Sequence, residues 1–135
     1  MKKKICIVVA NFYPKISNNL IIGASKILIK NNIRKFDKIV TNGVFEIPVI
    51  ISRKINKYDG FIALGCVIKG KTPHFNYISQ SVINALMVLS VVNKKPIGNG
   101  ILTCLNKKQA QQRSNNGLKN KGSEAAIATL SVLKI

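Results

Sequence analysis

Acidic residues are scarce in this 135-residue chain, which holds four of them against 22 lysines and arginines. Histidine is rarer still, with His74 as the single example. A magnesium–nucleotide site needs acidic ligands, and a zinc site needs several histidines or cysteines, so this sequence offers little to either. Acid–base chemistry would centre on His74, because histidine is the usual general acid or base near neutral pH.

Cysteine is also sparse, and Cys6, Cys66 and Cys104 are widely spaced and odd in number. No two of them have the C-x-x-C spacing, so with one histidine the chain lacks a set of zinc ligands. All three lie in apolar runs, where a free cysteine behaves as a small hydrophobic residue. The sequence therefore predicts three buried free thiols and no metal site.

Long apolar runs are absent as well, since no stretch approaches the roughly 18 uninterrupted apolar residues expected of a membrane helix. The start of the chain, MKKKICIVVA, has the basic-then-apolar order of a signal peptide. Asn11, Tyr13 and Pro14 end this apolar stretch after about six residues, short of the usual 7–15. We interpret it as a buried first strand, and we expect a cytoplasmic protein without a membrane partner.

A net charge of +18 is the most conspicuous feature that the sequence does have. It raises the alternative of a basic nucleic-acid-binding α/β protein. Arginine, which specific readers of bases and phosphates favour for its fork geometry, occurs only at Arg34, Arg53 and Arg113. The lysines are scattered without a long basic block, so nucleic acid is the weaker partner. The charge would also help to attract small anionic substrates.

Apolar runs and helical periodicities alternate along the chain. Four strands are predicted, at residues 5–10, 38–41, 61–68 and 100–105. Five helices are predicted, at residues 15–31, 45–55, 74–93, 107–112 and 123–134. This alternation predicts a four-stranded parallel sheet covered on both faces, a three-layer α/β/α sandwich of the flavodoxin-like type. No linker or repeat interrupts the sequence, so we expect a single domain over residues 1–135.

The segment GCVIKGKTPH, at residues 65–74, follows the third strand at the sheet edge where such folds bind ligands. Exposed N–H groups at the start of the following helix would favour an anion, with Lys71 and Thr72 adding a charge and a hydroxyl. The pattern G-x-x-x-x-G-K-T of a nucleotide-binding loop matches from Gly65 to Thr72. However, Cys-Val-Ile has the character of a strand where that loop should be glycine-rich, which makes this the weaker interpretation.

Three single residues are ambiguous when each is taken alone. Glu46 could accept hydrogen bonds from a ligand, or it could be a glutamate favoured by the helix dipole in a first turn. Arg113 could bind phosphate through two parallel hydrogen bonds, or it could be an ordinary surface arginine. His74 could act in proton transfer, or it could be a surface or capping histidine.

Six motifs remove much of this ambiguity when they are considered together. They are NFY at 11–13, GVFEIP at 43–48, GCVIKGKTPHFNY at 65–77, NGILT at 99–103, QAQQR at 109–113 and NKG at 120–122. In this order and spacing the chain resembles the lumazine synthase (6,7-dimethyl-8-ribityllumazine synthase) family over nearly its whole length. The block G-x-V-I-x-G-x-T-x-H is the most specific part, and it accounts for the nucleotide-loop match as a coincidence.

The resemblance implies an enzyme for the penultimate step of riboflavin biosynthesis. Such an enzyme condenses 5-amino-6-(D-ribitylamino)uracil with 3,4-dihydroxy-2-butanone 4-phosphate, releasing phosphate and water, without a metal or organic cofactor. Proton transfers dominate the reaction, and the enzyme chiefly positions its two substrates. A catalytically degenerate homologue, which keeps the pocket but has no turnover, remains an alternative.

The resemblance also implies roles for individual residues. His74 matches the proton-transfer histidine of the family. The residues that match substrate-binding positions for the pyrimidine and the ribityl chain are Phe12, Val44, Phe45, Glu46, Cys66, Val67, Ile68 and Asn99. The residues that match phosphate-binding positions are Lys71, Thr72 and Arg113, and Lys121 matches a further basic residue near the site.

The sequence departs from the family pattern at Tyr13, Asn42, Val44 and Lys71, where Asn, Pro, Ala and a small or acidic residue are commoner. Only a few residues precede the first strand, which puts in doubt the exchange of that segment between neighbours. The family is built on pentamers with active sites shared between adjacent subunits. We therefore expect a homopentamer.

Overall fold

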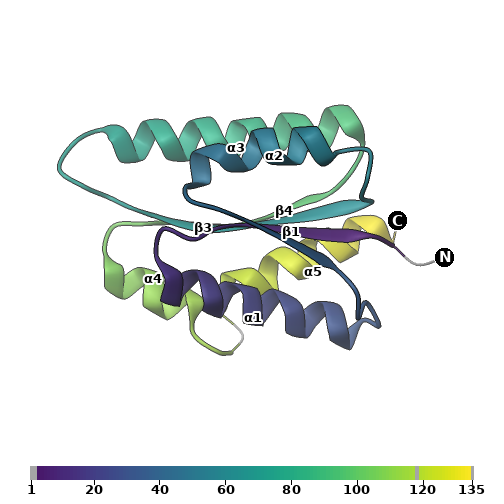
Figure 1. Ribbon diagram of the computed structural model, residues 1–135. Helices are drawn as coiled ribbons and strands as arrows, with labels where there is room; N and C mark the ends of the chain where they lie inside the picture. Colours follow the sequence, from purple (N-terminus) through teal and green to yellow (C-terminus); the bar gives the residue numbers. More distant parts are fainter. Residues whose placement is uncertain (1–2, 118, 135) are drawn as a thin grey trace.

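The computed structural model describes residues 3–117 and 119–134, which fold around one parallel sheet between two layers of helices (Figure 1). The sheet strands are β1 (Ile5–Ala10), β2 (Asp37–Thr41), β3 (Gly60–Ile68) and β4 (Ile97–Cys104). The helices are α1 (Pro14–Lys30), the 3₁₀ turn η1 (Val44–Glu46), α2 (Ile47–Lys54), α3 (His74–Asn93), α4 (Lys107–Ser114) and α5 (Lys121–Leu133). The predicted three-layer α/β/α architecture is confirmed.

The strand order is β2-β1-β3-β4, and every neighbouring pair is parallel. Helices α1, α4 and α5 cover one face, while α2 and α3 cover the other (Figure 1). The two central strands are buried along almost their whole length, which explains why their sequences are continuously apolar. Cys6, Cys66 and Cys104 are buried free thiols, as predicted.

Strand β4 begins at Ile97, three residues before the predicted start at residue 100. The prediction was wrong there because Gly98 and Gly100 interrupt the apolar pattern. Helix α5 packs too closely on β4 for a side chain at position 98, since a Cβ on Gly98 would lie 2.2 Å from the carbonyl oxygen of Ala125. The glycine therefore marks a close approach within a strand.

The helix predicted at residues 45–55 is divided in the structure into the turn η1 and the eight-residue helix α2. Val44 is buried against the sheet, since a Cβ on Gly65 would lie 2.6 Å from its Cγ1 atom. Pro48 lies in the first turn of α2, where it needs no N–H partner. The tight turn brings residues 44–46 directly over the end of β3.

Helix α3 matches its predicted bounds, but only Val82 and Leu86 are buried in it. By length and composition it is the one helix among the described residues that could cross a membrane. Polar side chains recur along it, and one face packs on the sheet. Its outer side instead exposes a group of large apolar residues, namely Tyr77, Met87, Val88, Val91 and Val92.

Candidate active site

The carboxyl ends of all four strands meet at one edge of the sheet, and two separate cavities open there. The first, of about 310 Å³, lies between the ends of β1 and β3, the turn η1 and the start of α3. Its lining residues are Phe12, Tyr13, Gly43, Val44, Phe45, Cys66, Val67, Ile68, His74 and Ile78. The structure thus brings together seven residues that the sequence nominated, from four distant segments.

Two exposed aromatic rings flank this first cavity. Phe12 is 70% exposed and Phe45 is 59% exposed, although both are large and apolar. Phe12 meets Tyr13 edge to face, with ring centroids 5.0 Å apart. Exposed rings at the mouth of a cavity can stack on a flat heterocycle, which would cover their apolar faces.

The floor of the first cavity is the last part of β3. Pairing between β1 and β3 ends at Val9 and Leu64, whereas pairing between β3 and β4 continues to Ile68 and Cys104. The end of β3 therefore has backbone groups on its β1 side with no strand beside them. Such groups can hydrogen-bond a planar ligand with alternating donors and acceptors, as an added strand would.

Burial and the nearby Cys104 raise the pKa of the Cys66 thiol to about 12. The thiol is consequently neutral near pH 7, and it is not a nucleophile, because the thiolate is the reactive form. Cys66 shapes the cavity as a small apolar side chain.

His74 is the first residue of α3, and its side chain is exposed at the first cavity. Its backbone N–H donates to the hydroxyl of Thr72, at 3.4 Å. Lys71 and Thr72 lie in the exposed loop before the helix, but they line neither cavity. The loop therefore lies beside the site and does not line it. Lys71 forms no ion pair with an acidic residue in the part of the chain that the structure describes.

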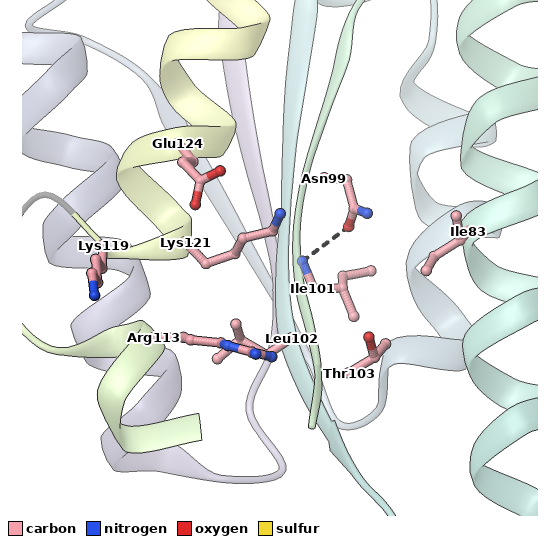
Figure 2. A pocket seen from close by; sticks show the side chains of 9 residues that line it. All are labelled: Ile83, Asn99, Ile101, Leu102, Thr103, Arg113, Lys119, Lys121 and Glu124. Carbon is pink, nitrogen blue, oxygen red and sulfur yellow. Dashed lines mark hydrogen bonds between the residues drawn. The ribbon is translucent and has the colours of Figure 1, made fainter. Parts of the chain in front are cut away.

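The second cavity, of about 430 Å³, wraps around the edge strand β4. Figure 2 shows Arg113 and Lys121 reaching β4 from the side of α4 and α5, with Asn99 and Thr103 on the side of α3. The complete lining is Ile83, Asn99, Ile101, Leu102, Thr103, Arg113, Lys119, Lys121 and Glu124. Three cations and one carboxylate therefore surround a space that suits an anion.

The local sequence explains how Arg113 is held there. The Asn106 side chain caps α4 by accepting the N–H of Gln109 at 2.9 Å, and the helix ends one residue after Arg113. Within residues 3–117 and 119–134, the one hydrogen bond of the guanidinium goes to the sulfur of Cys104, at 3.8 Å, which is a weak acceptor. Most of its donors are thus left for a ligand or solvent. On the other side of β4, the side-chain oxygen of Asn99 accepts the backbone N–H of Ile101 at 3.0 Å.

The predicted site residues are thus divided between the two cavities, except for Glu46, Lys71 and Thr72, which line neither. Arg113 and Asn99 line the second cavity, and His74 lines the first. Glu46 lines neither, because it faces a groove of about 370 Å³ between α2 and α3 together with Phe45 and Pro48. Lys119 and Glu124 were missed from the sequence, since a lone lysine in a loop and a first-turn glutamate carry no distinguishing signal.

A third cavity, of about 730 Å³ and so larger than these two, lies at the opposite end of the sheet. Lys3, before β1, and Arg34, after α1, are among its lining residues. It contains none of the nominated site residues, and it lies away from the edge where parallel sheets bind ligands. Among residues 3–117 and 119–134, no three potential metal ligands lie close enough together to hold a metal ion.

Comparison with known proteins adds independent information. A family model described as 6,7-dimethyl-8-ribityllumazine synthase matches residues 2–135. A protein of that name from Bartonella bacilliformis is 44% identical over 133 residues, covering 96% of this chain and 87% of its own. Those from Buchnera aphidicola subsp. Baizongia pistaciae and Agrobacterium fabrum are 40% and 39% identical, covering 99% of this chain and 87% and 95% of their own.

Proposed function

Because the chain belongs to the 6,7-dimethyl-8-ribityllumazine synthase family, we propose that its two cavities are halves of one active site, completed between adjacent subunits. The enzyme is a transferase of riboflavin biosynthesis. It condenses 5-amino-6-(D-ribitylamino)uracil with 3,4-dihydroxy-2-butanone 4-phosphate to give 6,7-dimethyl-8-ribityllumazine, phosphate and water. We place residues 1–135 in one domain and the protein in the cytoplasm.

The reaction needs a place for a planar pyrimidine, a place for a departing phosphate, and a group that moves protons between them. The amine of the pyrimidine and the ketone condense to an imine with loss of one water, phosphate is then eliminated, and ring closure expels a second water. Each step transfers protons, and none requires a metal or organic cofactor. Catalysis therefore depends mainly on positioning and on general acid–base chemistry.

We assign the pyrimidine and its ribityl chain to the first cavity. The ring stacks on Phe12 and hydrogen-bonds the free backbone edge of residues 66–68. Val44 and Phe45 close the opposite wall. The ribityl chain extends from this cavity into the adjoining groove, where Glu46 accepts hydrogen bonds from its hydroxyls. His74, exposed at the mouth, accepts and returns protons at the condensing amine and ketone.

We assign the phosphate to the space between the loop that holds Lys71 and Thr72 and the second cavity of a neighbouring subunit. Arg113 supplies two parallel donors, which match the oxygens of a phosphate. Lys121 adds positive charge. Asn99 of the same cavity would contact the pyrimidine ring that is bound in the first cavity of the adjacent subunit. Stabilising the departing phosphate lowers the barrier to elimination, because the charge grows as the C–O bond breaks.

Two observations support a site shared between subunits. His74 and Arg113 line different cavities of one chain, whereas the reaction needs both groups at one substrate pair. Helix α3, whose first residue is His74, also exposes Met87, Val88 and Val91, which a second copy would cover. Joining two different surfaces makes a heterologous contact, and such contacts close into rings. A homopentamer, the ring used by the family, fits this arrangement.

The grouping of His74 with Phe12, Val44 and residues 66–68 around one cavity is the observation that carries the proposal. Its test is an assay of lumazine formation from the two substrates. We expect turnover by the wild-type chain, and a kcat lower by roughly 10²–10⁴-fold in His74→Ala. The unfolding free energy should change by less than about 1 kcal/mol, because the imidazole is exposed.

The alternatives make different predictions for the same assay. A degenerate homologue would show no turnover even with its pocket intact. A nucleic-acid-binding protein would bind duplex or single strands with steep salt dependence and would be indifferent to His74. The family match over residues 2–135 favours neither alternative.

A further inference from the structure

Asn120 is the residue around which the cationic half of the site is built. Its side chain is 1% exposed, although it is polar. The amide nitrogen donates to the carbonyl oxygens of Asn19, Ser114 and Asn115, at 3.0, 2.9 and 3.3 Å. Because two N–H bonds are shared among three acceptors, α1, the end of α4 and the following loop are held at a single point.

The other atoms of Asn120 bind α5. The side-chain oxygen accepts the N–H of Ser123 at 3.1 Å, which caps the helix, and the backbone carbonyl accepts the N–H of Glu124 at 3.2 Å. A flipped amide would aim its oxygen at three carbonyls, so the orientation is well determined. One side chain thereby joins three helices.

Two glycines make room for this junction. A Cβ on Gly23 of α1 would lie 2.2 Å from the Asn120 side-chain oxygen. A Cβ on Gly122 of α5 would lie 2.1 Å from the backbone carbonyl oxygen of Leu20. The close crossing of α1 and α5 therefore leaves space for an asparagine amide and for little else.

The neighbours of this junction in the sequence are the cations of the second cavity. Lys119 and Lys121 flank Asn120, and Ser114, whose carbonyl it binds, directly follows Arg113. The Ser114 hydroxyl is itself buried and donates to the carbonyl of Ala110 at 2.8 Å, within the last turn of α4. Figure 2 shows Arg113 of α4 and Lys121 of α5 converging on β4.

We propose that Asn120 is a positioning residue that sets the distance between the Arg113 guanidinium and the Lys121 ammonium group, and so the affinity of the second cavity for phosphate. The inference rests on the proposed function for the identity of the phosphate-bearing substrate. Asn120 itself lines neither of the two cavities at the site. It acts by positioning Arg113 and Lys121, which remain positively charged when Asn120 is replaced.

The substitution Asn120→Ser separates its two roles. A serine hydroxyl caps a helix about as well as asparagine does, so α5 keeps its start, but the donors to three carbonyls are lost. We expect a KM for the dihydroxybutanone phosphate that is roughly ten- to a hundredfold higher, because a misplacement of about 1 Å has effects of that size. The KM for the pyrimidine should change less than about threefold, whereas the kcat should fall as well, because the same cations stabilise the departing phosphate.

Asn106→Ser is the matched control, because Asn106 caps α4 in the same way. Within the described residues, its amide nitrogen binds no other element, so this substitution should leave both KM values unchanged. Ile7→Val, in the buried centre of β1, controls for a general loss of stability of about 1 kcal/mol. Neither control should alter the ratio of the two KM values.

A second measurement does not depend on turnover. Calorimetric titration measures the affinity of the intact protein for inorganic phosphate. We expect this affinity to fall roughly ten- to a hundredfold in Asn120→Ser and hardly at all in Asn106→Ser. If the wild-type chain forms no lumazine, the proposed function fails, yet weakened phosphate binding still supports the role of Asn120. Equal phosphate affinity in wild type and Asn120→Ser, or no phosphate binding by the wild type, overturns the inference.

Discussion

Arg113 and Lys108 lie on the same short helix, but only Arg113 lines a cavity. Both side chains carry one positive charge and both are exposed. The difference between them is that Arg113 approaches the edge strand β4, where its planar group lines the second cavity. Comparing these two residues separates specific phosphate binding from the general attraction of a chain with a net charge of +18.

We predict that Arg113→Ala raises the KM for the phosphate-bearing substrate by roughly ten- to a hundredfold, because hydrogen bonds to a charged group contribute about 1.5–3 kcal/mol. Lys108→Ala removes the same charge and should change that KM by less than about twofold. Initial rates at varied phosphate substrate measure both. Equal increases in the two variants would mean that overall charge, and not the Arg113 contact, attracts the substrate.

Cys66 makes a prediction about stability at high pH. Burial and the neighbouring Cys104 raise its pKa in the folded protein from 9.0 to about 12. Between these values the unfolded chain loses a proton that the folded protein retains, so the free energy of unfolding falls as pH rises. The slope for this single group is at most about 1.4 kcal/mol per pH unit.

Urea denaturation at pH 7, 8, 9.5 and 10.5 measures this effect. The wild type should lose stability more steeply than Cys66→Ala above pH 9, and the two slopes should agree below it. Parallel curves over the whole range would show that the thiol ionises freely in the folded protein.

Among the elements, strand β4 and helix α5 approach each other closely at Gly98. Gly98 lies where a Cβ would be 2.2 Å from the Ala125 carbonyl oxygen and 2.4 Å from the Thr129 hydroxyl. That hydroxyl is buried and donates to the carbonyl oxygens of Phe61 and Ala125, so it has no free direction in which to move. The helix can accommodate a methyl group only by moving away from the strand.

We predict that Gly98→Ala lowers the free energy of unfolding by about 1–3 kcal/mol through overpacking. Gly70→Ala is the matched control, since a Cβ on Gly70 meets nothing within 4 Å. That control should be neutral or stabilising by up to about 1 kcal/mol, because alanine restricts the unfolded chain. Chemical denaturation measures both, and similar losses at the two positions would contradict the packing argument.

Helix α3 shows how far an element can be predicted from sequence. Its bounds were correct because Pro73 precedes it and its apolar spacing holds from Ile78 to Leu89. The same spacing gave no warning that its other side is apolar and exposed. A periodic pattern identifies a helix and one buried stripe, but the partner of a second stripe depends on what lies beside the helix in space.

The arrangement of cavities in the whole molecule leads to a mixing experiment. If each site takes His74 from one subunit and Arg113 from the next, then His74→Ala and Arg113→Ala chains complement one another. Random co-assembly in equal amounts should restore roughly a quarter of the sites to the wild-type composition. Each variant assembled alone supplies the control, with activity measured per subunit.

The opposite result is equally clear. If both residues serve the same subunit's site, mixed assemblies will show only the average of the two variants. Light scattering of the same samples must show oligomers, because complementation requires subunits in contact. A monomeric chain with full activity would contradict the shared site.

The sequence by itself determined the succession of strands and helices, the buried thiols and, through its family motifs, seven of the residues that line the first cavity. The strands and helices follow from local periodicity. The cavity residues belong to motifs at the ends of strands, and parallel packing brings those ends to one edge of the sheet. Only the tertiary structure decided the strand order, the separation of Arg113 from His74 and the junction at Asn120. These depend on which elements pack side by side, and the contacts that decide it join residues as far apart as Asn19 and Asn120.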